Sequence, residues 1–193
     1  PPHIQQMLST VDESVPQSTR DRLEQLLNRY SNALSSGPTD LGETDIICHT
    51  IDTGDHPPLR QALRPIPLAR RKALDVILEE DLAAGIIEPA RSPYAVNLVL
   101  VAKPDGSIRA CCDYRALNAV TKRDCYPLPR IDQCLSALGG RNAWYSTFDL
   151  RSGYYQVPMH PRDKEKTTFI CHRGSFCFRK MPMGLVNAGA TFQ

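Results

Sequence analysis

Two apolar runs flank a tight turn in residues 96–114, which read VNLVLVAKPDGSIRACCDY. Residues 96–101 and 108–114 carry the apolar and aromatic side chains that suit a pleated, half-buried surface. Between them, the run Pro104-Asp105-Gly106-Ser107 offers a proline that fixes φ and a glycine that accepts positive φ. The stretch therefore predicts a β-hairpin, and the rest of the chain is read outward from it.

Local patterns on both sides of this hairpin predict a mixture of helices and strands. Apolar residues at helical spacing predict one helix that begins near residue 14 or 18 and ends at Gly37-Pro38, and a second that begins near Pro67 and ends at Gly85. A third helix is expected over 127–138, with Ile131, Leu135 and Leu138 turned inward. Strands are expected over 46–51, 86–88, 144–150, 167–171 and 176–180, a helical turn over 152–157, and a last helix capped by Asn187. Residues 1–13 are polar and are expected to be loose. The order does not alternate βαβ, so the predicted class is α+β with antiparallel hairpins and packed helices.

The bulk composition leaves several function classes open and excludes few. The chain of 193 residues has 23 basic and 21 acidic side chains, and its net charge of +2 neither requires nor excludes a nucleic-acid partner. Seven cysteines without Cys-x-x-Cys spacing argue against a zinc site and for free thiols in a reducing compartment. No apolar run approaches the ~18–20 residues that cross a bilayer. We therefore expect an intracellular protein that is neither secreted nor membrane-bound, and a first residue other than methionine suggests a piece of a longer product.

Asp149 is the carboxylate with the strongest chemical interest. It closes an aromatic run over residues 144–148, which is expected to form a strand. A bare buried charge is costly, so this side chain must face a cleft, a metal or a partner group. On spacing alone, a structural ion pair or a turn position is favoured over a metal site.

The basic residues of the first hairpin and its exit also allow two interpretations. Lys103 leads into the turn and Arg109 opens the return strand, where they either grip phosphate groups or form an ordinary solvated tip. Asp113 and Arg115 are two residues apart and therefore lie on one face of a strand, which leaves open that they only pair with each other.

Four motifs in order now carry a resemblance to a known family. They are the hairpin above, CDYRALN at 112–118, FDLRSGY at 148–154 and MPMGL at 181–185. Together they resemble the fingers and first half of the palm of a reverse transcriptase, most closely the pol polyprotein of Ty3/gypsy-type long-terminal-repeat retrotransposons. The resemblance covers residues 52–193 and implies the right-hand polymerase fold. Residues 14–51 resemble the segment between protease and polymerase, and residues 1–51 are expected to be a connector with one amphipathic helix.

The resemblance also implies roles for particular residues. Asp149, assisted by the carbonyl of Leu150, corresponds to the metal-binding position, and the complete enzyme would use two Mg²⁺ (or Mn²⁺) ions. The implied dNTP-binding residues are Lys103, Arg109, Ser152, Gly153, Tyr154 and Met183. The implied template-binding residues are Asp113, Arg115 and Gly184. Tyr154 would reject a ribose 2′-hydroxyl by its bulk.

The function implied by the resemblance is RNA-directed DNA synthesis by two-metal phosphoryl transfer. The expected partners are an RNA or DNA template with its primer, dNTPs, and the remaining palm, thumb, RNase H and integrase of a polyprotein, in a cytoplasmic particle or the nucleus. The chain ends at Gln193 before a Tyr-x-Asp-Asp motif, so these residues alone are expected to be inactive. The alternative is a degenerate, non-catalytic module that binds nucleic acid or another partner. Asp52-Thr53-Gly54 matches a protease motif in letters only, because the apolar strands around such a motif are missing.

Overall fold

The computed structural model describes residues 1–37, 39–127, 129–140 and 145–193. The chain forms two compact units, Pro1–Gly42 and Glu43–Gln193. This division lies upstream of the domain boundary expected after residue 51, and the assignment of residues 1–51 as a connector stays a prediction. No helix in the described ranges is both long enough and apolar enough to cross a bilayer.

The first unit consists of two helices that contact each other, α1 (Pro2–Ser9) and α2 (Gln17–Arg29), followed by the short 3-10 helix η1 (Ser31–Ala33). The predicted α2 is confirmed, although it ends at Arg29, well before Gly37. The expectation that residues 1–13 are loose is wrong. Proline near the start is pre-organised for a helix, and Ile4 is completely buried, so a single apolar side chain orders a segment whose composition is polar.

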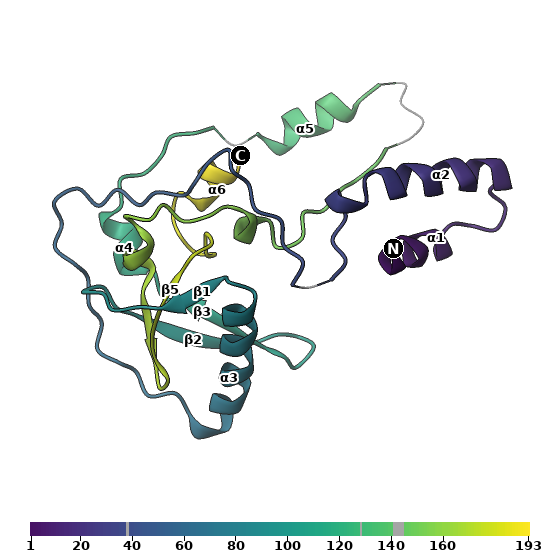
Figure 1. Cartoon of the computed structure of the whole chain (residues 1–193). Helices are drawn as coiled ribbons and strands as arrows, with labels where there is room; N and C mark the ends of the chain where they lie inside the picture. Colours follow the sequence, from purple (N-terminus) through teal and green to yellow (C-terminus); the bar gives the residue numbers. More distant parts are fainter. Residues whose placement is uncertain (38, 128, 141–144) are drawn as a thin grey trace. The chain divides into compact units, whose positions relative to one another are not determined.

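A five-stranded sheet organises the second unit (Figure 1). Its strands are β1 (Ile87–Pro89), β2 (Val96–Ala102), β3 (Ile108–Cys112), β4 (Phe169–Cys171) and β5 (Gly174–Phe178), in the spatial order β1-β5-β4-β2-β3. The β2–β3 and β4–β5 pairs are antiparallel hairpins, as predicted, while β2 and β4 pair in parallel through Val96 and Phe169. The α+β class is therefore confirmed.

The helix α3 (Leu68–Ala83) packs against this sheet and contacts β1 and β3 (Figure 1). Its residues Leu74 and Leu78 are buried, one turn apart on the predicted face. Gly85 then takes φ = +65°, a left-handed conformation that glycine adopts without strain and that helps to end the helix.

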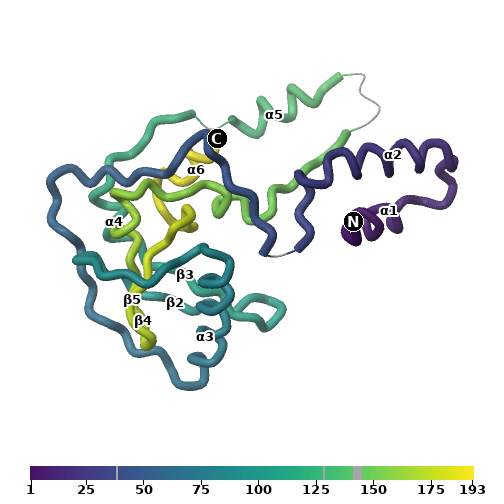
Figure 2. The backbone as a smooth tube through the Cα atoms, viewed as in Figure 1, coloured from purple at the N-terminus to yellow at the C-terminus, as the bar shows by residue number. Residues whose placement is uncertain are grey.

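Residues 43–66 form a long path before α3 (Figure 2), and from here on we call this segment, and not the predicted residues 1–51, the connector. It contains only isolated bridges. His49 pairs with Met159, and Arg60 pairs with Ala95. The strand expected over 46–51 is thus reduced to a single bridge. The imidazole of His49 is buried and lies 2.8 Å from the hydroxyl of Thr191, which fastens this part of the connector to the C-terminal helix α6 (Ala188–Phe192).

The remaining elements are α4 (Arg115–Val120), α5 (Ile131–Leu138) and the 3-10 turns η2 (Gly153–Gln156) and η3 (Lys164–Thr167). The predicted helix α5 exists, but the apolar residues expected inside are exposed: Ile131 by 79%, Leu135 by 64% and Leu138 by 52%. Asn187 precedes α6 as predicted. Its side chain bonds the backbone of Asp124 and Lys122, and makes no bond to the helix that it precedes.

The predicted strand over 144–150 is wrong for residues 145–150, which are irregular and exposed, while residue 144 lies outside the described ranges. A strand needs a neighbour to pair with its backbone groups. None of the five described strands pairs with this segment, and that tertiary condition is invisible in an aromatic run.

Candidate functional site

A groove of about 530 Å³ brings together residues that are far apart in the sequence. It is lined by Phe148, Asp149, Leu150, Gly153, Tyr154, Met183 and Phe192. Five of these residues belong to the predicted metal and dNTP sites. The seven lining residues come from the irregular segment 145–150, the turn η2, the loop after β5 and the helix α6, so the groove is a product of tertiary folding.

Asp149 lies in this groove on an exposed, irregular segment and not at the end of a strand. The ion pair that spacing alone favoured is absent: no Lys, Arg or His in the described ranges lies within salt-bridge distance of its carboxylate. Carboxylate and carbonyl oxygens are ligands that Mg²⁺ accepts. The described residues contain no group of three His, Cys, Asp or Glu side chains that could hold a metal ion, and the metal-binding role of Asp149 and Leu150 stays a prediction.

The backbone beside Asp149 turns sharply at Ser152. This residue has φ = 45° and ψ = 49°, the only positive φ of a non-glycine residue in the described chain, and it begins the turn η2. Gly153 follows, and a Cβ atom there would lie 2.7 Å from Cζ of Phe192. The sequence suggested that this glycine admits a ligand; the structure shows that it admits the ring of Phe192.

Tyr154 packs on the same ring. Its centroid lies 5.3 Å from that of Phe192 with an interplanar angle of 61°, an edge-to-face arrangement that aromatic pairs favour. Phe192 is therefore a residue of the groove that the sequence motifs did not reveal. No prediction was made for Phe192 from the sequence, because no local signal distinguishes a groove-lining aromatic residue from a core one.

A second groove of about 410 Å³ gathers all three predicted template-binding residues. It is lined by Val99, Cys112, Asp113, Tyr114, Arg115, Asn118 and Gly184. We call this the Asp113 groove, and the first one the Asp149 groove. The walls of the Asp113 groove come from the β2–β3 hairpin, the start of α4 and the loop after β5.

Asp113 and Arg115 do pair with each other, as one interpretation of the sequence held. The Nε and Nη2 groups of Arg115 each donate to a carboxylate oxygen of Asp113 at 2.7 Å. This guanidinium holds the pKa of Asp113 down to about 2. The Asp113 side chain is 7% exposed and that of Arg115 is 83% exposed, so the buried acid fixes a guanidinium that still faces solvent.

Asn118 organises the loop that carries Gly184. Its side-chain amide donates to the carbonyl of Gly184 at 2.7 Å and accepts from the backbone N–H of Val186 at 2.9 Å. Gly184 has φ = +95°, which L side chains rarely adopt, and a Cβ atom there would lie 3.7 Å from the ring of Tyr114. The sequence reading named Gly184 but missed Asn118.

Lys103 and Arg109 line neither groove. Both are exposed on the β2–β3 hairpin, Lys103 at the turn and Arg109 opposite Val101 in β3. The turn itself has the predicted form, with Gly106 at φ = +82° and the N–H of Lys103 bonded to the carbonyl of Ser107. The structure therefore confirms the hairpin without bringing its basic residues to Asp149.

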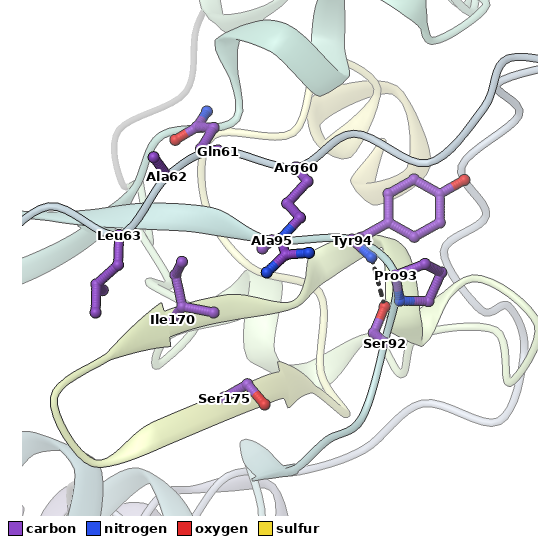
Figure 3. A pocket seen from close by; sticks show the side chains of 10 residues that line it. All are labelled: Arg60, Gln61, Ala62, Leu63, Ser92, Pro93, Tyr94, Ala95, Ile170 and Ser175. Atoms are coloured by element: carbon purple, nitrogen blue, oxygen red, sulfur yellow. Dashed lines mark hydrogen bonds between the residues drawn. The ribbon is translucent and has the colours of Figure 1, made fainter.

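A third depression of about 320 Å³ contains none of the predicted site residues (Figure 3). Ile170 and Ser175, a cross-strand pair of β4 and β5, form its floor, and Arg60 reaches over it from the connector. Its two serine hydroxyls are already engaged, since Ser92 donates to the carbonyl of Glu165 and Ser175 to that of Ala90.

Comparison with known proteins shows which family this chain resembles. Residues 101–193 match the family model described as reverse transcriptase (RNA-dependent DNA polymerase). The retrovirus-related Pol polyprotein from transposon 297 of Drosophila melanogaster is 33% identical over 177 residues, which cover 89% of this chain and 17% of that relative. The corresponding polyprotein from transposon gypsy of the same fly is 32% identical over 188 residues, covering 94% of this chain and 18% of the relative.

Solved structures show the same likeness. The protease–reverse transcriptase of prototype foamy virus superposes with a TM-score of 0.82 at 26% identity, over 99% of this chain and 25% of that chain. A foamy viral protease–reverse transcriptase in complex with an RNA/DNA hybrid has a TM-score of 0.80 at 20% identity, over 98% of this chain and 25% of that chain, and shares the fold.

The α+β fold and these likenesses define the class of protein as a reverse transcriptase, with its fingers and part of its palm. Within that class, the chain belongs with the Pol polyproteins of gypsy-type long-terminal-repeat retrotransposons. It spans less than one fifth of the length of those curated relatives.

Proposed function

We propose that this chain supplies the dNTP-binding and template-binding surfaces of an RNA-directed DNA polymerase. The observation that carries the proposal is the pair of grooves. The predicted metal and dNTP residues Asp149, Tyr154 and Met183 line one of them, and the predicted template residues line the other. The loop after β5 contributes to both, which is the relation that a template base and its incoming nucleotide require.

In this proposal, Asp149 is the carboxylate of the polymerase reaction, and the carbonyl of Leu150 assists it. Bound Mg²⁺ or Mn²⁺ would stabilise charge on the attacking 3′-oxygen and the leaving pyrophosphate. One carboxylate does not hold two ions, so we expect the 193-residue chain to be inactive by itself. The remaining ligands would come from elsewhere in a complete Pol polyprotein, such as the rest of the palm.

Tyr154 is the proposed sugar-selecting residue, and its ring is held in place by Phe192. The backbone amides of Ser152 and Gly153 are the proposed contacts to the triphosphate, and Met183 lies across the same groove. Lys103 and Arg109 would reach the phosphates only if the β2–β3 hairpin closes over the groove, a movement of an exposed turn.

Arg115 is the proposed contact to the template strand. Its bidentate bond to Asp113 uses Nε and Nη2, which leaves the other N–H groups of an 83% exposed guanidinium for a phosphate. Gly184 would allow a template base to approach the loop backbone closely. A template with its primer and dNTPs are thus the proposed partners, in a cytoplasmic particle or the nucleus.

A direct test measures the affinity of the chain for a fluorescent RNA template annealed to a DNA primer. We expect binding that weakens with salt, because phosphate contacts release counterions, and further weakening in Arg115→Ala. A matched control is Arg29→Ala, which removes a guanidinium from the first unit. Equal affinity of Arg115→Ala and wild type, or no binding of the duplex at all, would contradict the template assignment.

A second test addresses synthesis in the full-length polyprotein. Asp149→Asn keeps the shape of the side chain but removes its charge, and we expect it to abolish dNTP incorporation while duplex binding persists. Template-dependent incorporation by the 193-residue chain alone would contradict the proposed need for further ligands. The alternative function, a non-catalytic nucleic-acid-binding module, predicts that Asp149→Asn changes nothing.

A further inference from the structure

A buried polar cluster joins the connector to the Asp113 groove. Asn97 of β2 is 2% exposed, and every polar group of its side chain is used. Its Oδ1 accepts from the N–H of Arg64 at 2.8 Å, and its Nδ2 donates to the carbonyl of Ala62 at 2.8 Å and to Oε1 of Gln61 at 3.0 Å. A fully satisfied buried amide of this kind fixes a unique geometry.

Gln61 is the residue through which this cluster reaches the groove. Its Oε1 also accepts from the backbone N–H of Asn97 at 3.0 Å, and its Nε2 donates to the carbonyl of Asp113 at 3.3 Å. The N–H of Asp113 in turn donates to the carbonyl of Asn97 at 2.9 Å. Both backbone polar groups of Asp113 are therefore held by the Gln61–Asn97 pair.

Asp113 stands at the point where β3 has ended and α4 is about to begin. The bond from the Asp113 N–H extends the β2–β3 register by one residue beyond β3, and the bond from Gln61 holds the Asp113 carbonyl. Together these two bonds orient the residue that carries the carboxylate. The carboxylate then determines where the guanidinium of Arg115 lies. Figure 3 shows the amide of Gln61 directed away from Ile170 and Ser175, out of the third depression.

We propose that Gln61 is a positioning residue for template binding, which acts through the backbone of Asp113 on the orientation of Arg115. The proposal rests on the proposed template-binding function of the Asp113 groove. Gln61 lies in none of the sequence motifs and does not line the Asp113 groove; it lines only the third depression.

The sharpest variant is Gln61→Glu. It keeps an oxygen that accepts both bonds from Asn97, but it places a second oxygen against the carbonyl of Asp113. The added negative charge is matched by Ala62→Glu, at the adjacent exposed position. Gln61→Ala removes the donor without adding charge. Affinity for the fluorescent primer–template is measured for all of these variants.

We expect Gln61→Glu to raise the dissociation constant about two- to tenfold relative to Ala62→Glu. We expect Gln61→Ala to raise it by about the same factor relative to wild type, since this is the range for one hydrogen bond. A protonated glutamic acid can donate to the carbonyl of Asp113, so mild acidification should restore affinity in Gln61→Glu and not in Gln61→Ala. A merely structural residue would give no such rescue. Equal affinities of Gln61→Glu and Ala62→Glu at both pH values, with Arg115→Ala still impaired, would overturn the proposal.

A readout without nucleic acid separates this proposal from the proposed function. If wild type fails to bind the duplex, the template assignment fails, but the coupling is still tested by titrating Asp113 by NMR in the free chain. Loosening of the Asp113–Arg115 pair should raise the pKa of Asp113 in both Gln61 variants and leave it unchanged in Ala62→Glu. An unchanged pKa of Asp113 in Gln61→Ala would overturn the inference.

Discussion

Met183 and Gly184 are consecutive residues, yet they line different grooves: Met183 lines the Asp149 groove and Gly184 lines the Asp113 groove. The left-handed φ of Gly184 turns the backbone at this point, and Asn118 holds its carbonyl. One peptide thus separates the two surfaces that we assign to nucleotide and template. A distortion here should affect both.

Gly184→Ala tests this shared wall. Alanine at φ = +95° is strained, so we expect a loss of about 1–3 kcal/mol of unfolding free energy and weaker primer–template binding. Denaturant unfolding and fluorescence binding measure the two effects. The control is Gly37→Ala, where the backbone φ is not positive and no atom lies within 4 Å of the added Cβ. Equal effects of the two substitutions would contradict the strain argument.

Gly153→Ala should be destabilising for a different reason. The added methyl group would lie 2.7 Å from the ring of Phe192, and overpacking of this kind costs about 1–3 kcal/mol. The double variant with Phe192→Leu should recover part of that loss, giving a coupling energy in a double-mutant cycle. Additive effects of the two substitutions would mean that the ring does not pack on this glycine.

Tyr154→Ala in the full-length polyprotein should relax discrimination against ribonucleotides, because the ring proposed to exclude the 2′-hydroxyl is gone. Phe192→Ala should produce a weaker change in the same direction, since it removes the ring that supports Tyr154. Single-nucleotide incorporation with dNTP and rNTP measures the ratio. Unchanged rejection of rNTPs in Tyr154→Ala would contradict the sugar-selecting role proposed for Tyr154.

Asp81 should make the protein less stable as the pH rises. Burial raises its pKa from 3.8 to about 6, so the folded chain binds this proton more tightly than the unfolded chain. The stabilisation is complete below pH 3.8 and is lost between pH 3.8 and about 6. Asp81→Asn should therefore gain about 1–2 kcal/mol of unfolding free energy at neutral pH. Glu80→Gln, at the adjacent exposed residue, is the control and should change stability less.

His49 should act with the opposite sign. Burial lowers its pKa from 6.5 to about 4, so its contribution is present above pH 6.5 and is lost as the pH falls toward 4. The windows of Asp81 and His49 overlap, and their effects partly cancel in the wild type. Asp81→Asn should expose the acid sensitivity, and His49→Gln should remove it. The measurement is the urea midpoint of unfolding across this pH range. If both variants keep the pH dependence of the wild type, the opposing contributions assigned to Asp81 and His49 are contradicted.

Local patterns predicted those parts of the fold that local contacts determine. The helix α3, the two hairpins and the turn η2 follow from apolar spacing and from turn residues such as Gly106. For these elements the information lies within a short stretch of sequence. The site roles came instead from the family resemblance, which assigned roles to five of the seven residues that line the Asp149 groove.

The errors have a common physical origin. Residues 145–150 needed a neighbouring strand, and the apolar face of α5 needed a surface to cover it; neither is encoded in the segment itself. Phe192, Asn118 and Gln61 contact residues that lie 36 to 68 positions away in the sequence. Phe192 packs on Tyr154, Asn118 bonds Gly184 and Val186, and Gln61 bonds Asn97 and Asp113. Tertiary hydrogen bonds and ring contacts leave no periodicity to read.

The parallel pairing of β2 with β4 has a kinetic consequence. Each hairpin can close on its own, but the sheet is complete only when Val96 pairs with Phe169, which lies 73 positions further along the chain, and such non-local pairing forms slowly. During synthesis on the ribosome, the edge of β2 that pairs with β4 stays unpaired until the β4–β5 hairpin emerges. That interval exposes an apolar strand edge to aggregation, and a chaperone that shields it should raise the yield of folded protein.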